Sequence, residues 1–165
     1  NYNEYLDFRR VEFLTVEDGA NNSEIYEIVT DASNAMKNLE WDNEIYVANG
    51  GNMDVELGGI DYVIGATGRQ DTINFKLADI VSAGNDESVV NLSNLSSGEG
   101  DKLVATDASS YMSDTDKGLL EAALAEGISN GVSQVRFSYD DVNNEVTLGL
   151  DSLADVTYNL DLYSA

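Results

Sequence analysis

Short apolar runs separated by glycine-rich turns fill the middle of the chain. Between residues 44 and 106 they read EIYVA, MDVEL, IDYVIGA, TINFKL and LVAT, and the turns between them include Asn49-Gly50-Gly51-Asn52. Runs of this length between turn residues are typical of strands, and their close spacing is typical of sandwiches and barrels. The sequence therefore predicts a mainly β fold, which we expect to be an antiparallel sandwich- or barrel-like sheet.

The best local signal is a hairpin near the C-terminus. In QVRFSY, residues 134–139, apolar side chains alternate with polar ones, the residues DDVNN at 140–144 form a turn, and alternation resumes at Val146. Two alternating runs joined by an Asp/Asn turn predict a β-hairpin. We also expect strands within residues 4–16, with a bulge near Arg9-Arg10, and within 23–30, and a short helix over 31–39.

One amphipathic helix is predicted near residues 114–128. Ser113 and the acids that follow it provide cap oxygens and negative charge at the positive end of the helix dipole. The apolar stripe at helical spacing consists of Leu119, Leu120, Ala123, Leu124 and Ile128. Asp114-x-Asp116 resembles the start of an EF-hand loop, but the later ligand positions do not fit, so we interpret these acids as a helix cap.

The length of 165 residues and the absence of a long linker indicate one domain, residues 1–165. If the chain has an internal boundary, we expect it near 82–88. The first residue is Asn1 rather than Met, which suggests a processed end or the edge of a fragment.

The charge of the chain excludes several classes of partner. The 31 acids and 8 bases give a net charge of −23, distributed as −10 over residues 1–78 and −13 over residues 79–165. Such a field repels phosphate backbones and anionic membranes, and no apolar run is long enough for a span, so we expect neither nucleic-acid binding nor membrane insertion. Salt relieves the self-repulsion of an acidic shell, which favours a marine or extracellular setting.

The chain contains neither histidine nor cysteine. This removes Ser-His-Asp chemistry, thiol nucleophiles and nearly all catalytic zinc sites. We therefore expect no enzyme, no catalytic residue and no organic cofactor. A small depolymerase-type domain that cleaves glycans with two carboxylates stays open as an alternative.

Calcium is the one cofactor for which the sequence offers ligands. Asp140, Asp141 and Glu145 lie at the tip of the predicted hairpin and form a weak candidate site, because carboxylate oxygens are the ligands that Ca²⁺ prefers. The same residue types are common in simple turns. A secreted adhesin or matrix-fibre module stabilised by calcium is therefore the first alternative function.

Two C-terminal stretches and one central stretch resemble appendage proteins of tailed bacteriophages. Gln134–Leu148 (QVRFSYDDVNNEVTL) is similar to a hairpin of tail-fibre proteins, and Leu150–Thr157 (LDSLADVT) is similar to a leader sequence of these fibres. Val90–Ala105 (VNLSNLSSGEGDKLVA) is a second, partial copy. The resemblance implies a structural and adhesive role in symmetric virion attachments, some of which contact host surface glycans.

The sequence thus predicts a non-enzymatic structural protein of a virion or extracellular filament. Its expected partners are copies of itself and neighbouring structural proteins, with a homo-oligomer held by paired strands and apolar patches. The candidate interface residues belong to the apolar-aromatic terminal segments and are Tyr5, Leu6, Phe8, Phe13, Leu160, Leu162 and Tyr163. Pairing of both segments within their own domain is the alternative.

Overall fold

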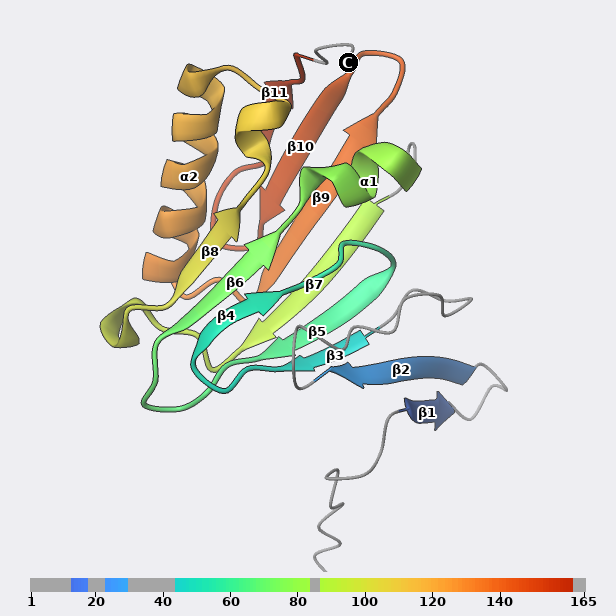
Figure 1. Cartoon of the computed structure of the whole chain (residues 1–165), viewed down its shortest axis with the longest axis vertical. Coiled ribbons are helices and arrows are strands. Elements are labelled where there is room, and N and C mark those ends of the chain that lie inside the picture. The colour runs from blue at the N-terminus through green and yellow to red at the C-terminus, as the bar shows by residue number, and fades with distance from the viewer. Residues whose placement is uncertain (1–12, 18–22, 30–43, 84–86, 162–165) are drawn as a thin grey trace, which may run out of the picture.

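The computed structural model describes residues 13–17, 23–29, 44–83 and 87–161. These residues form two β layers, a large sheet and a small sheet, with two α-helices beside them (Figure 1). The large sheet contains, in spatial order, β1 (Phe13–Glu17), β2 (Ser23–Val29), β3 (Glu44–Val47), β5 (Ile60–Ile64), β7 (Glu87–Ser93), β9 (Gln134–Asp140), β10 (Glu145–Leu150) and β11 (Val156–Asn159). The small sheet contains β4 (Gly51–Asp54), β6 (Asp71–Phe75) and β8 (Lys102–Ala105).

From β3 to β8 the chain alternates between the two sheets. In this part of the chain a strand of the large sheet is always followed by a strand of the small sheet. In the large sheet β3 pairs in parallel with β5, and β5 with β7; in the small sheet β4 pairs in parallel with β6, and β6 with β8. The chain therefore winds as three coils, β3–β4, β5–β6 and β7–β8, in the manner of a β-solenoid. We call residues 44–107 the coiled region.

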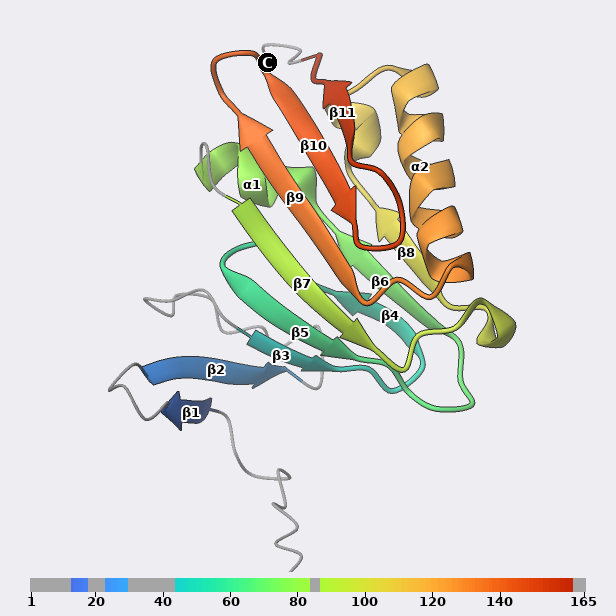
Figure 2. The same cartoon turned by 180° about the vertical axis from the view of Figure 1, so that it is seen from behind.

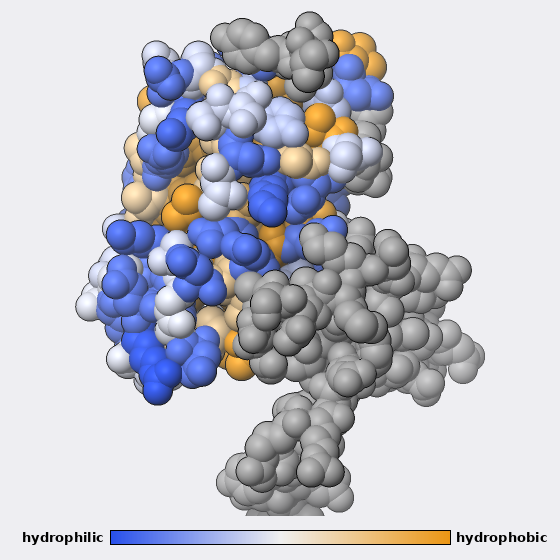
Figure 3. All heavy atoms as spheres, in the orientation of Figure 1, coloured by the Kyte–Doolittle hydropathy of each residue, from blue (hydrophilic) through white to orange (hydrophobic). Residues whose placement is uncertain are grey.

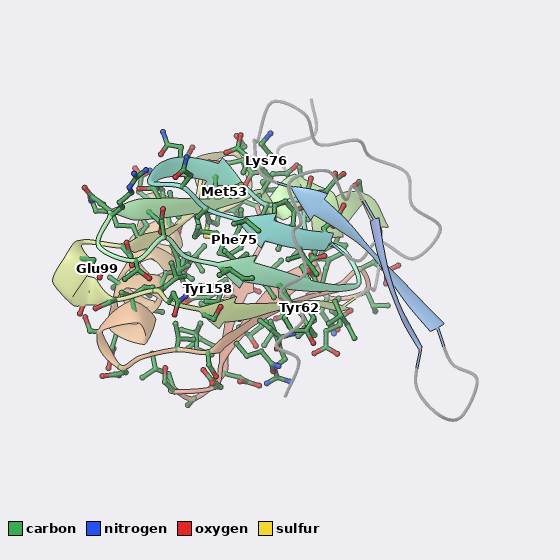
Figure 4. All side chains as sticks on the ribbon, turned by 90° about the horizontal axis from the view of Figure 1, so that it is seen from below. Met53, Tyr62, Phe75, Lys76, Glu99 and Tyr158 are labelled. Atoms are coloured by element: carbon green, nitrogen blue, oxygen red, sulfur yellow. The ribbon has the colours of Figure 1, made fainter. Side chains whose placement is uncertain are left out.

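The core of the coiled region lies between its two sheets. Met53, Ile73 and Leu103 occupy matching positions of β4, β6 and β8, and all three are buried. Phe75 of β6 meets Phe137 of β9 edge to face, with ring centroids 5.4 Å apart, and Figure 4 shows Phe75 between the layers. Stacking of like residues in successive coils thus forms one continuous apolar interior.

The last part of the chain is an antiparallel meander. β9 pairs with β7 and then with β10, and β10 pairs with β11, so this part extends the large sheet beyond the coils. Two helices complete the fold: α1 (Leu77–Ala83), which lies against β9, and α2 (Asp114–Ser129), which lies along β8. Ser113 caps α2 by accepting a hydrogen bond from Asp116 N. We call residues 134–159 the antiparallel region.

The mainly β character, the predicted helix over 114–128 and the hairpin over 134–150 are confirmed. The predicted antiparallel arrangement is wrong for the coiled region, because strands of successive coils pair in parallel. The sheets also do not close into a barrel. The turns between successive runs carry the chain from one sheet to the other, so that strands of successive coils pair in parallel. Helix α1 was not predicted because a seven-residue helix carries little periodic signal.

Smaller expectations have mixed outcomes. Leu119, assigned to the buried stripe of the helix, is 56% exposed. The proposed helix over 31–39 and the bulge near Arg9-Arg10 lie outside the described residues. In the part of the chain that the structure describes, neither helix has the length and apolar character needed to span a membrane.

Candidate functional site

Five aspartates join each coil to the preceding one. Each carboxylate accepts a hydrogen bond from a backbone N–H of the coil before its own. We call Asp61, Asp71, Asp79, Asp101 and Asp107 the cross-coil aspartates; their donors are the backbone N–H groups of Glu44, Gly50, Leu57, Asp71 and the pair Leu77 and Ala78. In every one of these contacts the carboxylate belongs to the later coil and the N–H group to the earlier one.

Asp71 and Asp101 have the same geometry in successive coils. Asp71 accepts from Gly50 N at 2.8 Å and from Ala66 N at 2.6 Å, while Asp101 accepts from Asp71 N and from Ser96 N, both at 2.7 Å. Both carboxylates are buried. A buried carboxylate that accepts several amide hydrogen bonds stabilises the fold, whereas the amides would lose free energy without it.

These acids were missed because the sequence was interpreted as a uniformly solvated acidic shell. The missed signal is the match between ATGRQD at 66–71 and SSGEGD at 96–101, in which a glycine is the third residue and an aspartate the sixth. The segment GATGRQD at 65–71 could suggest a phosphate-binding loop, but it lacks the Lys-Ser/Thr of a P-loop, so the sequence favours a tight turn. The structure makes it a turn, and Gly68 N donates to Glu99 Oε1, an acceptor that phosphate would have to displace.

The outward face of the large sheet carries apolar side chains over the coiled region. Ile60, Tyr62 and Ile64 of β5 are 42%, 41% and 38% exposed. On β3 half-buried Ile45 and Val47 flank Tyr62 and Ile64 in register. On β7 half-buried Val89 flanks Ile60, whereas the other two partners, Asn91 and Ser93, are polar. We call Ile45, Val47, Ile60, Tyr62, Ile64 and Val89 the outer apolar patch.

Alternation in β5 is the reverse of what its sequence suggests. IDYVI would ordinarily place both isoleucines and the tyrosine in the core and the aspartate outside. Instead Asp61 and Val63 are buried and the larger apolar residues face outward. Tyr62 projects from the outer side of the sheet in Figure 4. A local conflict between sequence pattern and burial is a mark of a functional surface.

No described helix crosses β3, β5 and β7 on this outer face, which Figure 2 shows from behind. The patch itself contains no charged residue, although acids exceed bases by 23 in the whole chain. The opposite face, over the small sheet and α2, is covered mostly by hydrophilic side chains in Figure 3. The outer apolar patch is therefore an uncharged surface on a strongly acidic chain, and Arg136, which pairs with Glu87 and Asp155, borders it at Val89.

A groove of about 490 Å³ lies between β8 and α2. Its apolar lining includes Leu103 and Val104 from the strand and Ala125 and Ile128 from the helix. β8 is an edge strand of the small sheet, and no described strand pairs with its outer side. We call this cavity the β8–α2 groove.

The calcium candidates lie at the β9–β10 turn, as predicted, but the turn itself uses the first of them. Asp140 accepts from Val142 N at 2.9 Å and from Asn143 N at 3.1 Å, and Asn143 Nδ2 donates to its other oxygen. Hydrogen bonds from the Asn143 side chain and backbone lower the pKa of Asp140. Among the described residues, no three acids come together as a metal-binding group.

Only two of the predicted interface residues fall within the described residues. Leu160 is buried, and its N–H donates to Asn144 O, so its assignment to an interface is wrong: it packs in the chain's own core. Phe13 belongs to β1, whose backbone pairs with β2 of the same chain. Tyr5, Leu6, Phe8, Leu162 and Tyr163 lie outside the described residues.

No family model, curated protein or solved structure matches this chain. The resemblance to tail-fibre proteins thus gains no support from these comparisons, and function has to be argued from the geometry.

Proposed function

We propose that the chain is a non-enzymatic structural module of a virion or an extracellular filament, which assembles with copies of itself and with neighbouring structural proteins. The observation that carries this proposal is the outer apolar patch, an uncharged apolar surface on a chain of net charge −23. The resemblance of residues 90–105 and 134–157 to tail-fibre proteins agrees with it. Contact with a host surface glycan stays a prediction.

The apolar side chains supply the attraction. Complete burial of an Ile or a comparable side chain contributes about 1.5–3 kcal/mol, so the three exposed residues of β5 together contribute several kcal/mol at most. Association itself costs about 4–15 kcal/mol in lost translational and rotational freedom. The patch therefore requires a partner surface that also covers the flanking strands, as when two sheets pack face to face about 10 Å apart.

The charges set the conditions for assembly. Two copies of this chain repel each other, and the repulsion extends over a Debye length of about 8 Å at physiological salt. Contact through the uncharged patch keeps most acids at the periphery, where salt screens them. Self-association should therefore become stronger as ionic strength rises, whereas association through ion pairs would weaken.

The coiled region suits a structural role for a second reason. Each coil contacts mainly its neighbours, and the cross-coil aspartates satisfy amides at the coil ends. Stacked units of this kind form stiff modules whose ends and faces are available to other chains.

The proposal is tested by light scattering coupled to size-exclusion chromatography at about 0.05 M and 0.5 M salt, on either side of the physiological screening range. The wild-type chain should form an oligomer that is favoured at the higher salt. Ile64→Asp should shift it towards monomer because a charge then lies in the contact. Thr157→Asp, a matched change at an exposed position of β11, should leave the oligomer unchanged.

Circular dichroism establishes that both variants fold. A monodisperse wild-type monomer at both salt concentrations would overturn the proposal. Equal loss of the oligomer in the two variants would also overturn it, because the patch would then have no special role.

A further inference from the structure

The β8–α2 groove offers both requirements for the addition of an extended segment. The first is a sheet edge. Thr106 N donates to Phe75 O, and because N–H groups alternate along a strand, those of residues 102 and 104 also face β6. The backbone of Leu103 therefore directs its N–H and C=O away from the small sheet, towards the groove.

The second requirement is a place for side chains. Leu103, Val104, Ala125 and Ile128 line the groove with apolar atoms, and Ala125 leaves room beside the helix. An added strand places alternate side chains on opposite sides. One set would meet this apolar lining and the other would face solvent, which is the usual way in which an edge strand recognises a peptide.

The charge around the groove selects the chemistry of the occupant. Glu99, in a 3₁₀ turn over Ser97–Glu99, stands beside the start of β8. Of the residues that line the groove, Asp101 and Glu121 are acidic and Lys102 is basic, a net charge of −1. Glu121, which lies in the groove lining, is exposed. A segment with apolar residues and adjacent positive charges is therefore complementary.

One segment of the chain has this composition. Residues 5–10 read YLDFRR, and Arg9-Arg10 is the only pair of adjacent basic residues in the sequence. Leu6, Phe8 and Arg10 share one side of an extended segment. The twelve residues before Phe13 have a reach of about 40 Å when extended.

The position of β1 determines which copy the segment meets. β1 lies at one edge of the large sheet, whereas β8 and α2 lie at the opposite side of the molecule (Figure 1). We propose that the β8–α2 groove of one copy binds residues 5–10 of a second copy as an added strand. This inference rests on the proposed self-assembly and identifies a contact separate from the outer apolar patch.

The test uses disulfide trapping, for which the chain provides an empty background because it has no cysteine. A ¹⁵N-labelled Leu6→Cys chain is mixed with an unlabelled Ala125→Cys chain under mild oxidation, and the mixed-isotope dimer is measured by mass spectrometry. At a chain concentration of about 10 μM, docking raises the effective thiol concentration to about 1 mM, so the dimer should form on the order of a hundredfold faster than with an undocked cysteine. Leu119→Cys, at an exposed position of α2 outside the groove lining, is the matched control.

A second variant checks the charge argument without changing the groove. Arg9→Glu with Arg10→Glu in the Leu6→Cys chain should reduce the rate to that of the Leu119→Cys control. Equal rates for Ala125→Cys and Leu119→Cys would overturn the inference. A Leu6→Cys, Ala125→Cys double variant that closes only within one chain at low concentration would also overturn it.

The two proposals fail in different ways. If the wild-type chain is an oligomer that Ile64→Asp dissociates but no trapping occurs, the groove inference alone is wrong. If the wild-type chain is monomeric in light scattering, the proposed function fails as well.

Discussion

The coiled region and the β9–β10 turn of the antiparallel region both use aspartates as acceptors, but over different ranges along the chain. In the coiled region Asp61 reaches an amide 17 residues away and Asp101 one 30 residues away. At the turn of the antiparallel region Asp140 binds amides only two and three residues away. The same residue type thus fixes long-range stacking in one region and shapes a local turn in the other.

This difference shows what the acidic composition does. Part of the negative charge is not a solvent shell, because the cross-coil aspartates act as structural acceptors for backbone amides that no neighbouring strand satisfies. Loss of a long-range acceptor should separate two coils, whereas loss of a local acceptor should loosen one turn. The predictions below test that distinction.

The largest effect is expected from Asp71→Ala. The change leaves the N–H groups of Gly50 and Ala66 without their acceptor, and each unsatisfied amide costs about 1–3 kcal/mol. The free energy of unfolding, measured by urea denaturation, should therefore fall by about 2–5 kcal/mol.

Asp54→Ala is the matched control for that change. Asp54 is exposed on β4, and its one hydrogen bond to another described residue comes from the Asn74 side chain, so its loss should alter stability by no more than about 0.5 kcal/mol. Equal effects of the two substitutions would show that Asp71 is an ordinary surface acid. Asp140→Ala should also have a smaller effect than Asp71→Ala.

The two regions also differ in how much of them the sequence predicts. The hairpin and α2 were predicted because their signals are local: alternation on both sides of an Asp/Asn turn, and Ser113 before a helical stripe. The coils were not, because strands that pair 17 to 30 residues apart carry no mark of parallel or antiparallel pairing. An antiparallel sheet was therefore predicted, because antiparallel strand pairs are the commoner kind.

The candidate surfaces were less predictable still. β5 reads as a strand with Ile60 and Ile64 inward, and only the tertiary structure shows that Asp61 faces inward to reach Glu44 N. Because the aspartate takes the inner position, the larger apolar residues are forced outward. The outer apolar patch is thus a consequence of the same cross-coil contact that closes the stack, which no local pattern could indicate.

An intermediate effect is expected where two coils approach each other most closely. A Cβ at Gly65 would overlap the Asn94 carbonyl oxygen and lie 2.7 Å from Leu95 Cδ2. Gly65→Ala should therefore destabilise the chain by about 1–3 kcal/mol, the usual cost of overpacking. Thermal unfolding followed by circular dichroism measures the change.

The matched substitution is Gly118→Ala in α2. A Cβ there meets nothing within 4 Å, and alanine is favoured over glycine inside a helix by about 0.5–1 kcal/mol. This variant should be more stable than the wild type. Destabilisation by both substitutions would contradict the explanation that Gly65→Ala destabilises the chain through a steric clash between two coils.

The smallest effect concerns pH and Asp151, an exposed acid that follows β10. Partial burial acts to raise the pKa of Asp151, but hydrogen bonds from the Ser133 hydroxyl and N–H and from Gln134 outweigh it and lower the pKa below its usual value. A carboxyl whose pKa is lower in the folded state stabilises the fold above its unfolded pKa of about 3.9, and this stabilisation is lost as the pH falls through the folded value. Because Asp151 is exposed, the contribution should stay below about 1 kcal/mol. Ser133→Ala removes the side-chain donor but keeps the backbone donors, so it should flatten the acid limb of the stability curve between about pH 5 and 2 in part, and less than Asp151→Asn does. Adding Ser133→Ala to Asp151→Asn should flatten the curve no further. Additive effects in urea denaturation across that range would show that the two residues act independently.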